Sequence, residues 1–235
     1  MTIKQIKFKV GEEVLDAINI TKDKELPTVL MLHGAGNSNK NRLIPLAKQL
    51  FENGLGIFCF DFSGQGCSTS NKISSIQKKT DEAISALKYL NPKLKITIIA
   101  FSMSGQVAIN LMLSKYKNRI ENLILFAPAL YDKKALEVHF GVKFSKIIRK
   151  TNSWKNNNAP EALKNFQGKL LIFFSRNDNI IPEEIPEILI NSAVGTSNKK
   201  IIFLNHAPHQ LAKWTSDKKE NAEFVAKEIL QHIMS

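Results

Sequence analysis

A serine, an aspartate and a histidine, Ser102, Asp178 and His209, each come shortly after an apolar run of strand type. Together these residue types can perform acyl transfer: the serine attacks a carbonyl, the histidine moves its proton, and the aspartate orients the imidazole. A serine hydroxyl is inert at neutral pH unless a sharp turn holds it beside a base and oxyanion donors. The elements around these residues must therefore supply that turn and those donors.

Ser102 lies where a strand-like run stops and a helix-forming segment begins, which is the position of a nucleophile elbow. The positions two before and two after such a serine are usually glycine, because strand and helix pack closely there. Here they are Ala100 and Ser104, both small, and we expect Gly105 to supply flexibility one residue later. We expect the Met103 N–H, at the start of the helix, to be an oxyanion donor. Taken alone, a serine in this position would more often be a helix cap than a nucleophile.

A glycine-rich turn, His33-Gly34-Ala35-Gly36, follows the apolar run 28–32 upstream of this serine. Its glycines allow a sharp change of backbone direction, and the Ala35 N–H could be the second oxyanion donor. A plain strand-ending turn explains the glycines equally well in isolation. We expect His33 to be structural and hydrogen-bonded to loop backbone, and not to be the catalytic base.

Two residues compete for the role of base and two for the role of acid. We prefer His209 to His206 because the small pair 207–208 before His209 would expose its ring toward the site. Asp178 lies in a strand-end loop where a carboxylate can receive an imidazole N–H, although a turn-forming aspartate is the alternative. Asp132, after another strand, is the substitute acid.

Strand-like runs alternate with helical stripes from residue 28 onward, which is typical of βαβ units and predicts an α/β fold with a mostly parallel central sheet and helices on both faces. The runs 3–10 and 14–20 predict an antiparallel pair at the sheet edge. Phe224 is expected to point inward from the last helix. The length suits a single domain, residues 1–235. Helical stripes cover residues 39–51, 81–90, 103–117 and 221–233.

Residues 131–166 form an amphipathic insert between two strands, with apolar side chains interleaved with lysine and arginine. One interpretation is a helix pair that covers the sheet edge and keeps its basic face in water. The other is a small helical cap or lid, with Phe140, Phe144 or Trp154 contacting substrate. The two interpretations are compatible.

Composition narrows the class of protein. The net charge of +12, from 33 Lys plus Arg against 21 Asp plus Glu, is spread along the chain without an arginine cluster, so no nucleic-acid partner is expected. No apolar run approaches the roughly 20 residues that span a bilayer, and no signal sequence is visible, so we expect no stable membrane insertion. Cys59 and Cys67 are too few for a disulfide framework or a zinc site, which favours a cytoplasmic location. Nothing near Cys67 would stabilise a thiolate nucleophile.

The order of motifs resembles that of the α/β-hydrolase superfamily across essentially the whole chain. The run Asp61-Phe62-Ser63-Gly64-Gln65-Gly66-Cys67-Ser68 resembles the Asp-x-x-Gly-x-Gly-x-Ser loop of many small members, and Phe126-Ala127-Pro128-Ala129 resembles the strand-end segment after the elbow. The chain is most similar to the branch containing monoacylglycerol lipases, cinnamoyl or feruloyl esterases and serine aminopeptidase-like proteins. Asp61 and the loop glycines are expected to be structural.

The expected function is therefore a serine hydrolase that cleaves a small-molecule carboxylic ester, with a small or medium acyl group, through an acyl-enzyme. Ser102, His209 and Asp178 would form the triad, and the Ala35 and Met103 N–H groups would form the oxyanion hole. This chemistry needs no metal and no organic cofactor. The alternatives are a thioesterase or an amide or peptide hydrolase with the same triad, and a non-catalytic binding protein on the hydrolase fold.

Overall fold

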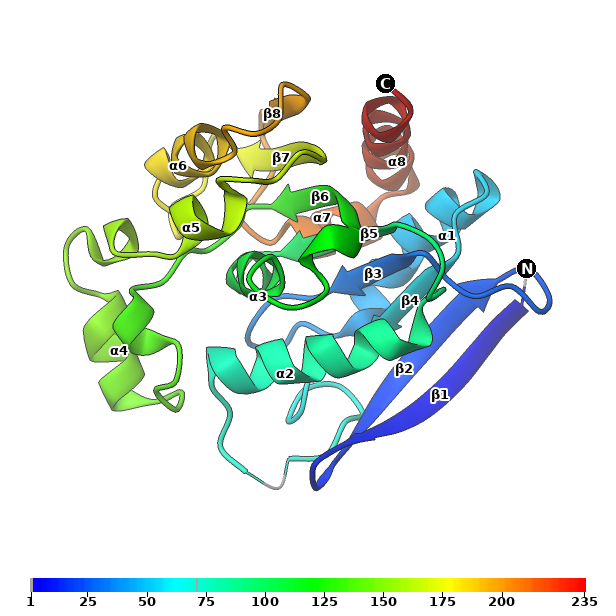
Figure 1. Cartoon of the computed structure of the whole chain (residues 1–235), viewed down its shortest axis with the longest axis horizontal. Coiled ribbons are helices and arrows are strands. Elements are labelled where there is room, and N and C mark those ends of the chain that lie inside the picture. Colours follow the sequence, from blue (N-terminus) through cyan, green and yellow to red (C-terminus); the bar gives the residue numbers. More distant parts are fainter. Residues whose placement is uncertain (1, 71) are drawn as a thin grey trace.

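A central sheet of eight strands orders the molecule in this computed structural model, which describes residues 2–70 and 72–235 (Figure 1). Residues 1 and 71 of the expected domain lie outside the described residues. The strand order is β1-β2-β4-β3-β5-β6-β7-β8; β1 and β2 pair antiparallel, β2 pairs antiparallel with β4, and all later pairs are parallel. The strands are β1 (Thr2–Val10), β2 (Glu13–Thr21), β3 (Val29–Leu32), β4 (Ile57–Phe60), β5 (Ile96–Phe101), β6 (Ile120–Phe126), β7 (Lys169–Ser175) and β8 (Lys199–Leu204).

Helices cover both faces of the sheet and create two apolar cores. Along β5, Ile98 and Ala100 point into one core, and Ile99 and Phe101 point into the other. Strands in the middle of the sheet are buried on both sides, which is why they are continuous apolar runs. Helices α2, α3, α5 and α6 pack on the first face, and α1, α7 and α8 pack on the second. The α-helices are α1 (Ile44–Glu52), α2 (Ile76–Ala86), α3 (Ser104–Leu111), α4 (Val142–Ile148), α5 (Ala159–Leu163), α6 (Glu184–Ser192), α7 (Leu211–Asp217) and α8 (Lys219–Met234).

Five short 3₁₀ helices connect these elements within the described part of the chain. They precede or extend α-helices, or shape the loops between strands, where tighter turns are common. They are η1 (Lys40–Leu43), η2 (Leu87–Tyr89), η3 (Lys117–Arg119), η4 (Lys133–Ala135) and η5 (Ser153–Lys155).

The predicted fold class, an α/β-hydrolase fold with a mostly parallel sheet, is confirmed, but several helix predictions were inaccurate. Helix α2 begins at Ile76, before the predicted residue 81, because the Ser75 hydroxyl caps it by accepting a hydrogen bond from the Lys78 N–H at 3.1 Å. Helix α3 ends at Leu111, short of residue 117. Helix α7 was not predicted. Phe224 is 42% exposed, because the buried face of α8 contains the next residue, Val225, together with Ala222 and Ile229.

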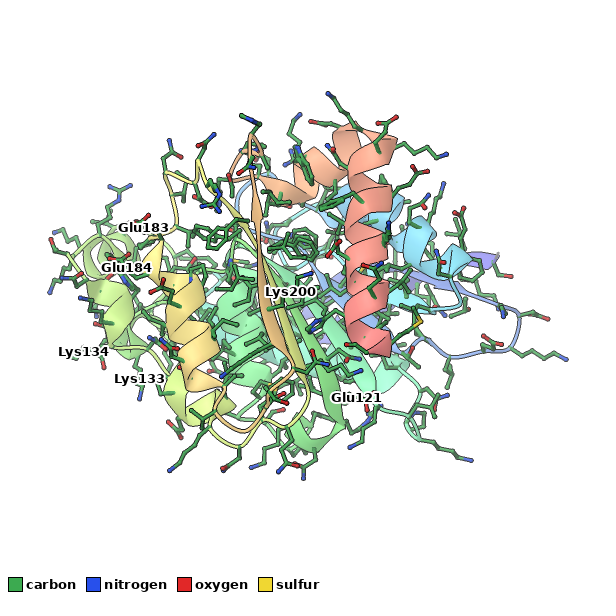
Figure 2. All side chains as sticks on the ribbon, turned by 90° about the horizontal axis from the view of Figure 1, so that it is seen from above. Glu121, Lys133, Lys134, Glu183, Glu184 and Lys200 are labelled. Atoms are coloured by element: carbon green, nitrogen blue, oxygen red, sulfur yellow. The ribbon has the colours of Figure 1, made fainter. Side chains whose placement is uncertain are left out.

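The 131–166 insert lies between β6 and β7 and contains α4 and α5. Figure 1 shows α4 at the end of the molecule opposite the β1–β2 hairpin. Its aromatic side chains turn inward, with Phe144 buried against Phe140, whereas Val142 is exposed and Lys133 and Lys134 lie exposed on its outer side (Figure 2). The insert is therefore amphipathic in the structure too, and its action as a lid stays a prediction.

None of the helices in residues 2–70 and 72–235 has the length and apolar character needed to cross a membrane.

Candidate active site

Ser102 lies in a strained turn between β5 and α3. Its φ is +51°, a left-handed conformation that serine rarely adopts. The turn is held by its own backbone: the Ser102 N–H donates to the Phe126 carbonyl at 2.8 Å, and the Ser102 carbonyl accepts from Gly105 at 2.8 Å and from Ala129 at 2.9 Å. The end of β6 thus fixes the conformation that lifts the serine side chain out of the strand.

The small residues around Ser102 fit this turn without the usual glycines. Ala100 and Ser104 are both fully buried, and the Ser104 hydroxyl donates a hydrogen bond to the His33 carbonyl. Gly105 has a different role from the flexibility that we expected. It does not have a positive φ, and a Cβ on it would lie 2.6 Å from the Pro128 Cβ. Its lack of a side chain lets α3 approach the segment after β6.

A chain of hydrogen bonds joins the three residues that the sequence singled out. Ser102 Oγ lies 3.1 Å from His209 Nε2, and His209 Nδ1 lies 2.7 Å from Asp178 Oδ2. An imidazole that donates from Nδ1 to the carboxylate presents Nε2 as an acceptor for the serine proton. The His209 side chain is 17% exposed and the Asp178 side chain is fully buried, so the imidazole faces the cavity and the carboxylate lies behind it.

Asp178 is held in its ionised form. Burial alone would raise its pKa, but hydrogen bonds from the His209 imidazole and from the Ile181 and Ile180 N–H groups hold the pKa of this carboxyl below its usual range. Both N–H groups donate to Asp178 Oδ1 at 2.9 Å, which leaves Oδ2 for the histidine. The carboxylate can therefore orient the imidazole and stabilise its protonated form.

The competing residues lie elsewhere. His206 is exposed, has a φ of +64°, and forms part of the turn after β8. Asp132 Oδ1 accepts hydrogen bonds from the Lys134 N–H at 2.9 Å and from the Asn156 side-chain amide at 2.8 Å. It caps η4 and ties the insert together, so its carboxylate is committed to the cap.

The expected oxyanion donors are free to bind a ligand. Within the described residues, neither the Ala35 N–H nor the Met103 N–H donates a hydrogen bond to another group. The loop that carries Ala35 is held in place by the Gln65 side-chain amide, which donates hydrogen bonds to the Gly34 carbonyl at 3.2 Å and the Gly36 carbonyl at 2.9 Å. Donors that are already in place need no reorganisation when charge develops on a substrate oxygen.

His33 is bonded to loop backbone, as expected for a structural residue. Its Nε2 accepts a hydrogen bond from the Phe62 N–H at 3.2 Å, so Nδ1 carries the proton and donates to the Gly34 carbonyl at 2.8 Å. Burial lowers the pKa of His33 to about 4, so the imidazole is neutral at physiological pH. It is fully buried and links the loops after β3 and β4.

Two cavities adjoin this site. The first, of about 600 Å³, contains Ser102 and His209 and is lined by Trp154. The second, of about 440 Å³, contains Met103 and is lined by Phe140 and Phe144. Ala35, Gly36 and Tyr131 line both cavities. Of the three aromatic residues expected to contact substrate, one therefore lines the first cavity and two line the second, and the two cavities meet at the loop that carries Ala35 and Gly36.

The charged side chains in these cavities are all basic. Arg42 and Lys213 line the first cavity, and Lys72 and Lys79 line the second; no aspartate or glutamate of the described chain lines either one. Arg42 and Lys79 were not identified from the sequence. Lys79 could have been found, because it lies one helical turn from Ile76 and from Ala83, on the apolar stripe of α2.

Asp16, Asp61 and Cys67 bring three metal-ligating atoms within 4.8 Å of one another. However, the Lys40 ammonium lies between the two carboxylates, 2.5 Å from Asp16 and 2.6 Å from Asp61. Asp61 also accepts hydrogen bonds from the Lys40 N–H at 2.7 Å and the Cys67 N–H at 2.9 Å. These groups satisfy one another and anchor the loop after β4, so their chemistry is that of a buried ion-pair cluster.

Comparison with known proteins agrees with this architecture. Residues 23–164 match the model of the family described as serine aminopeptidase, S33. No match is found among curated protein sequences. Similar solved structures include α/β hydrolase domain-containing protein 10 from mouse, with 12% identity, a TM-score of 0.72 and 97% of each chain covered.

Two further structures are similar to almost the whole chain. One is a thioesterase domain from the curacin biosynthetic pathway, with 15% identity, a TM-score of 0.72, and 98% of this chain and 100% of that chain covered. The other is a serine hydrolase from the polyaromatic hydrocarbon-degrading bacterium Cycloclasticus zankles, with 17% identity, a TM-score of 0.70, and 97% and 98% covered. At these identities the likeness shows the fold alone. The family match spans more than half of the chain, and the protein therefore belongs to the serine aminopeptidase S33 family of the α/β-hydrolase superfamily.

Proposed function

We propose that this hydrolase cleaves carboxylic esters of small or medium acyl groups through an acyl-enzyme on Ser102. The observation that carries the proposal is the continuous hydrogen-bonded chain from Ser102 Oγ through His209 to the buried Asp178, beside two unused N–H groups. A serine in a strained elbow, a base at hydrogen-bond distance and an oriented carboxylate are the components of nucleophilic acyl transfer.

The mechanism follows from these positions. His209 Nε2 accepts the Ser102 proton as Oγ attacks the ester carbonyl, and the Ala35 and Met103 N–H groups stabilise the oxyanion of the tetrahedral intermediate. The protonated imidazole then gives its proton to the departing alkoxide, which leaves as the alcohol. Water then attacks the acyl-enzyme while His209 Nε2 takes its proton. The protonated imidazole returns that proton to Ser102 Oγ as the carboxylic acid is released.

The charges in the cavities favour an ester over a peptide with a free N-terminus. An aminopeptidase must bind the substrate ammonium, for which a carboxylate is the natural partner. The first cavity instead contains Arg42, which has no ion-pair partner among the described residues, and Lys213, which pairs with Asp217 at 2.5 Å. We therefore do not propose aminopeptidase activity for this chain, although its family carries that description.

The test combines labelling with a substrate panel. A fluorophosphonate should label the wild-type protein at Ser102, and Ser102→Ala should lose the label and reduce kcat by about 10⁴- to 10⁶-fold. Ser216→Ala is the matched control, because the Ser216 hydroxyl donates only to the Lys213 carbonyl within its own helix. It should leave labelling and rate unchanged.

The panel consists of 4-nitrophenyl esters of increasing acyl length, the corresponding thioesters, and aminoacyl anilides. We expect esters to be hydrolysed fastest and anilides slowest. An equal rate in Ser102→Ala would show that Ser102 is not the nucleophile. Absence of both label and hydrolysis in the wild type would show that the fold is non-catalytic. Faster cleavage of thioesters or anilides would leave the triad assignment intact and show that the enzyme cleaves a thioester or an amide bond instead of an ester bond.

A further inference from the structure

Lys79 is a buried cation in the second cavity. Its side chain on α2 is only 3% exposed, and its Nζ donates to Gln65 Oε1 at 3.0 Å and to the Ser63 carbonyl at 3.5 Å. The ammonium lies 4.7 Å from the centroid of the Phe62 ring and 5.9 Å from that of Phe140. Ser63, Gln65 and Phe140 line the cavity together with Lys79, so the charged end of the side chain borders the cavity.

No carboxylate of the described residues forms an ion pair with this ammonium. The nearest candidate on the same helix, Glu82, directs both of its oxygens to Ser63: one accepts from the Ser63 N–H at 3.0 Å and the other from the Ser63 hydroxyl. Buried lysines in folded proteins are normally paired, because burial of an isolated charge is costly. Lys79 thus has hydrogen-bond acceptors and the through-space field of Glu82, but no carboxylate of the described residues contacts its ammonium.

The position of the cavity relative to the oxyanion donors gives this cation a use. Met103 and Ala35 line the same cavity, so a substrate whose carbonyl oxygen binds their N–H groups can extend one end toward Lys79. The other end would occupy the first cavity beside His209. Lys72 also lines the second cavity, but its ammonium pairs with Glu12 at 3.1 Å and is well exposed.

We propose that Lys79 binds an anionic oxygen group of the substrate, a carboxylate or a phosphate, within the second cavity. This inference rests on the proposed esterase function and narrows its substrate class to esters that carry a negative charge away from the reacting carbonyl. Lys79 is then a specificity-determining residue, and the anion supplies the direct ion-pair partner that the described residues do not.

A purely structural role explains less. Gln65, the strongest partner of Lys79, is already fixed by donating its amide to the Gly34, Gly36 and Ser38 carbonyls at 3.2, 2.9 and 3.3 Å. A neutral side chain of similar length would fill the same space between the aromatic rings. Burial lowers the pKa of Lys79 to about 8, with Glu82 opposing and Lys78 reinforcing the decrease. The positive charge of Lys79 is therefore unfavourable in the folded protein, although a charged ammonium is not needed to fill the space.

The test compares pairs of esters that differ only in charge. On the acyl side, the 4-nitrophenyl monoester of glutaric acid is compared with the same ester whose free carboxyl is methylated. On the alcohol side, 4-carboxyphenyl acetate is compared with its methyl ester. For each pair the measure is the ratio of kcat/KM for the anionic ester to that for the neutral ester, taken within one preparation so that the active fraction cancels.

We expect the wild type to prefer the anionic member of one pair, and that pair identifies which side of the ester enters the second cavity. In Lys79→Met the ratio should fall by about 10- to 100-fold, the effect of losing a hydrogen bond to a charged group. Lys79→Gln should behave alike, and thermal unfolding verifies that both variants fold. The matched control is Lys78→Met, because Lys78 is adjacent on α2 but pairs with Glu13 at 2.5 Å outside the cavity; its ratio should not change.

A ratio that is the same in wild type and Lys79→Met, for both pairs, would overturn the inference while leaving the esterase function intact. Absence of hydrolysis of all four esters would instead contradict the proposed function. In that case, protection against thermal unfolding by glutarate or by inorganic phosphate still tests the anion site. We expect one of them to raise the Tm of the wild type and not that of Lys79→Met, and equal shifts in both proteins would refute the site.

Discussion

Replacing Lys79 by methionine should stabilise the folded protein at pH 7. Burial lowers the pKa of Lys79 from 10.5 to about 8, and at roughly 1.36 kcal/mol per unit this corresponds to about 3 kcal/mol of disfavoured charge. The variant also loses the hydrogen bond to Gln65 and the contacts with the Phe62 and Phe140 rings, which together offset about 1 to 2 kcal/mol. The expected net gain is about 1 to 2 kcal/mol.

The pH dependence of this gain identifies its cause. Between pH 8 and pH 10.5 the folded protein has released the Lys79 proton and the unfolded chain still binds it. The free energy of unfolding of the wild type therefore rises relative to that of the variant across this window. The advantage of Lys79→Met should be full below pH 8 and should disappear toward pH 10.5, where the loss of contacts alone makes the variant the less stable protein.

Urea unfolding at pH 7 and at pH 10, followed by circular dichroism, measures both values, and an unchanged m-value shows that the same transition is compared. Lys78→Met is again the control. Its ion pair with Glu13, whose carboxylate is buried and also accepts hydrogen bonds from Thr69 and the Lys72 N–H, predicts a loss of stability at pH 7, opposite in sign to the effect of Lys79→Met. A Lys79→Met variant that is less stable than the wild type at pH 7, or a difference that does not vary with pH, would refute the reasoning that the buried charge is costly.

Three further substitutions test the site and its support. His209→Gln should reduce kcat/KM by at least about 10³-fold because the base is lost, whereas His206→Gln should leave the rate unchanged; equal losses would mean that the base is misassigned. Asp178→Asn should reduce kcat by about 10²- to 10⁴-fold by disturbing the imidazole tautomer, and Asp132→Asn should not; activity that depends on Asp132 would exchange the two acids. Gly66→Ala should lower the Tm by several degrees, because its φ is +54° and a Cβ would lie 2.0 Å from an Asp61 carboxylate oxygen; an unchanged Tm would contradict the close packing of this loop.

The sheet and the positions of the three candidate site residues could be predicted because they depend on local patterns. Parallel strands buried on both faces must be apolar runs, and the residues that follow them collect at one edge of the sheet. That reasoning placed Ser102, Asp178 and His209 together without any knowledge of side-chain contacts. The choice of His209 over His206 rested on the small residues before it, and the structure indeed turns the His206 ring into solvent.

The residues that the sequence did not identify are those whose roles depend on packing between distant segments. Lys79 lies in a run with Lys78, and both residues fall outside the helix when the helix is assumed to begin at residue 81. Once Ile76 is known to start α2, Lys79 falls on its inward stripe. Phe224 was predicted to be buried and is exposed, because α8 is oriented so that the adjacent Val225 faces the core instead.

The elbow departs from the usual glycine pattern, and the structure shows what the departure provides. A glycine at position 104 would leave the His33 carbonyl without the hydroxyl that now donates to it. His33 in turn accepts from the Phe62 N–H and bonds the Gly34 carbonyl, so one chain of hydrogen bonds links the elbow, the oxyanion loop and the loop after β4. Because three strand ends are connected in this way, Ser104 contributes to the relative position of Ser102 and the Ala35 N–H, a constraint that glycine could not supply. The loop after β4 also carries Gln65, the partner of Lys79, so the same chain of hydrogen bonds extends from Ser104 to the cavity where we place the substrate anion.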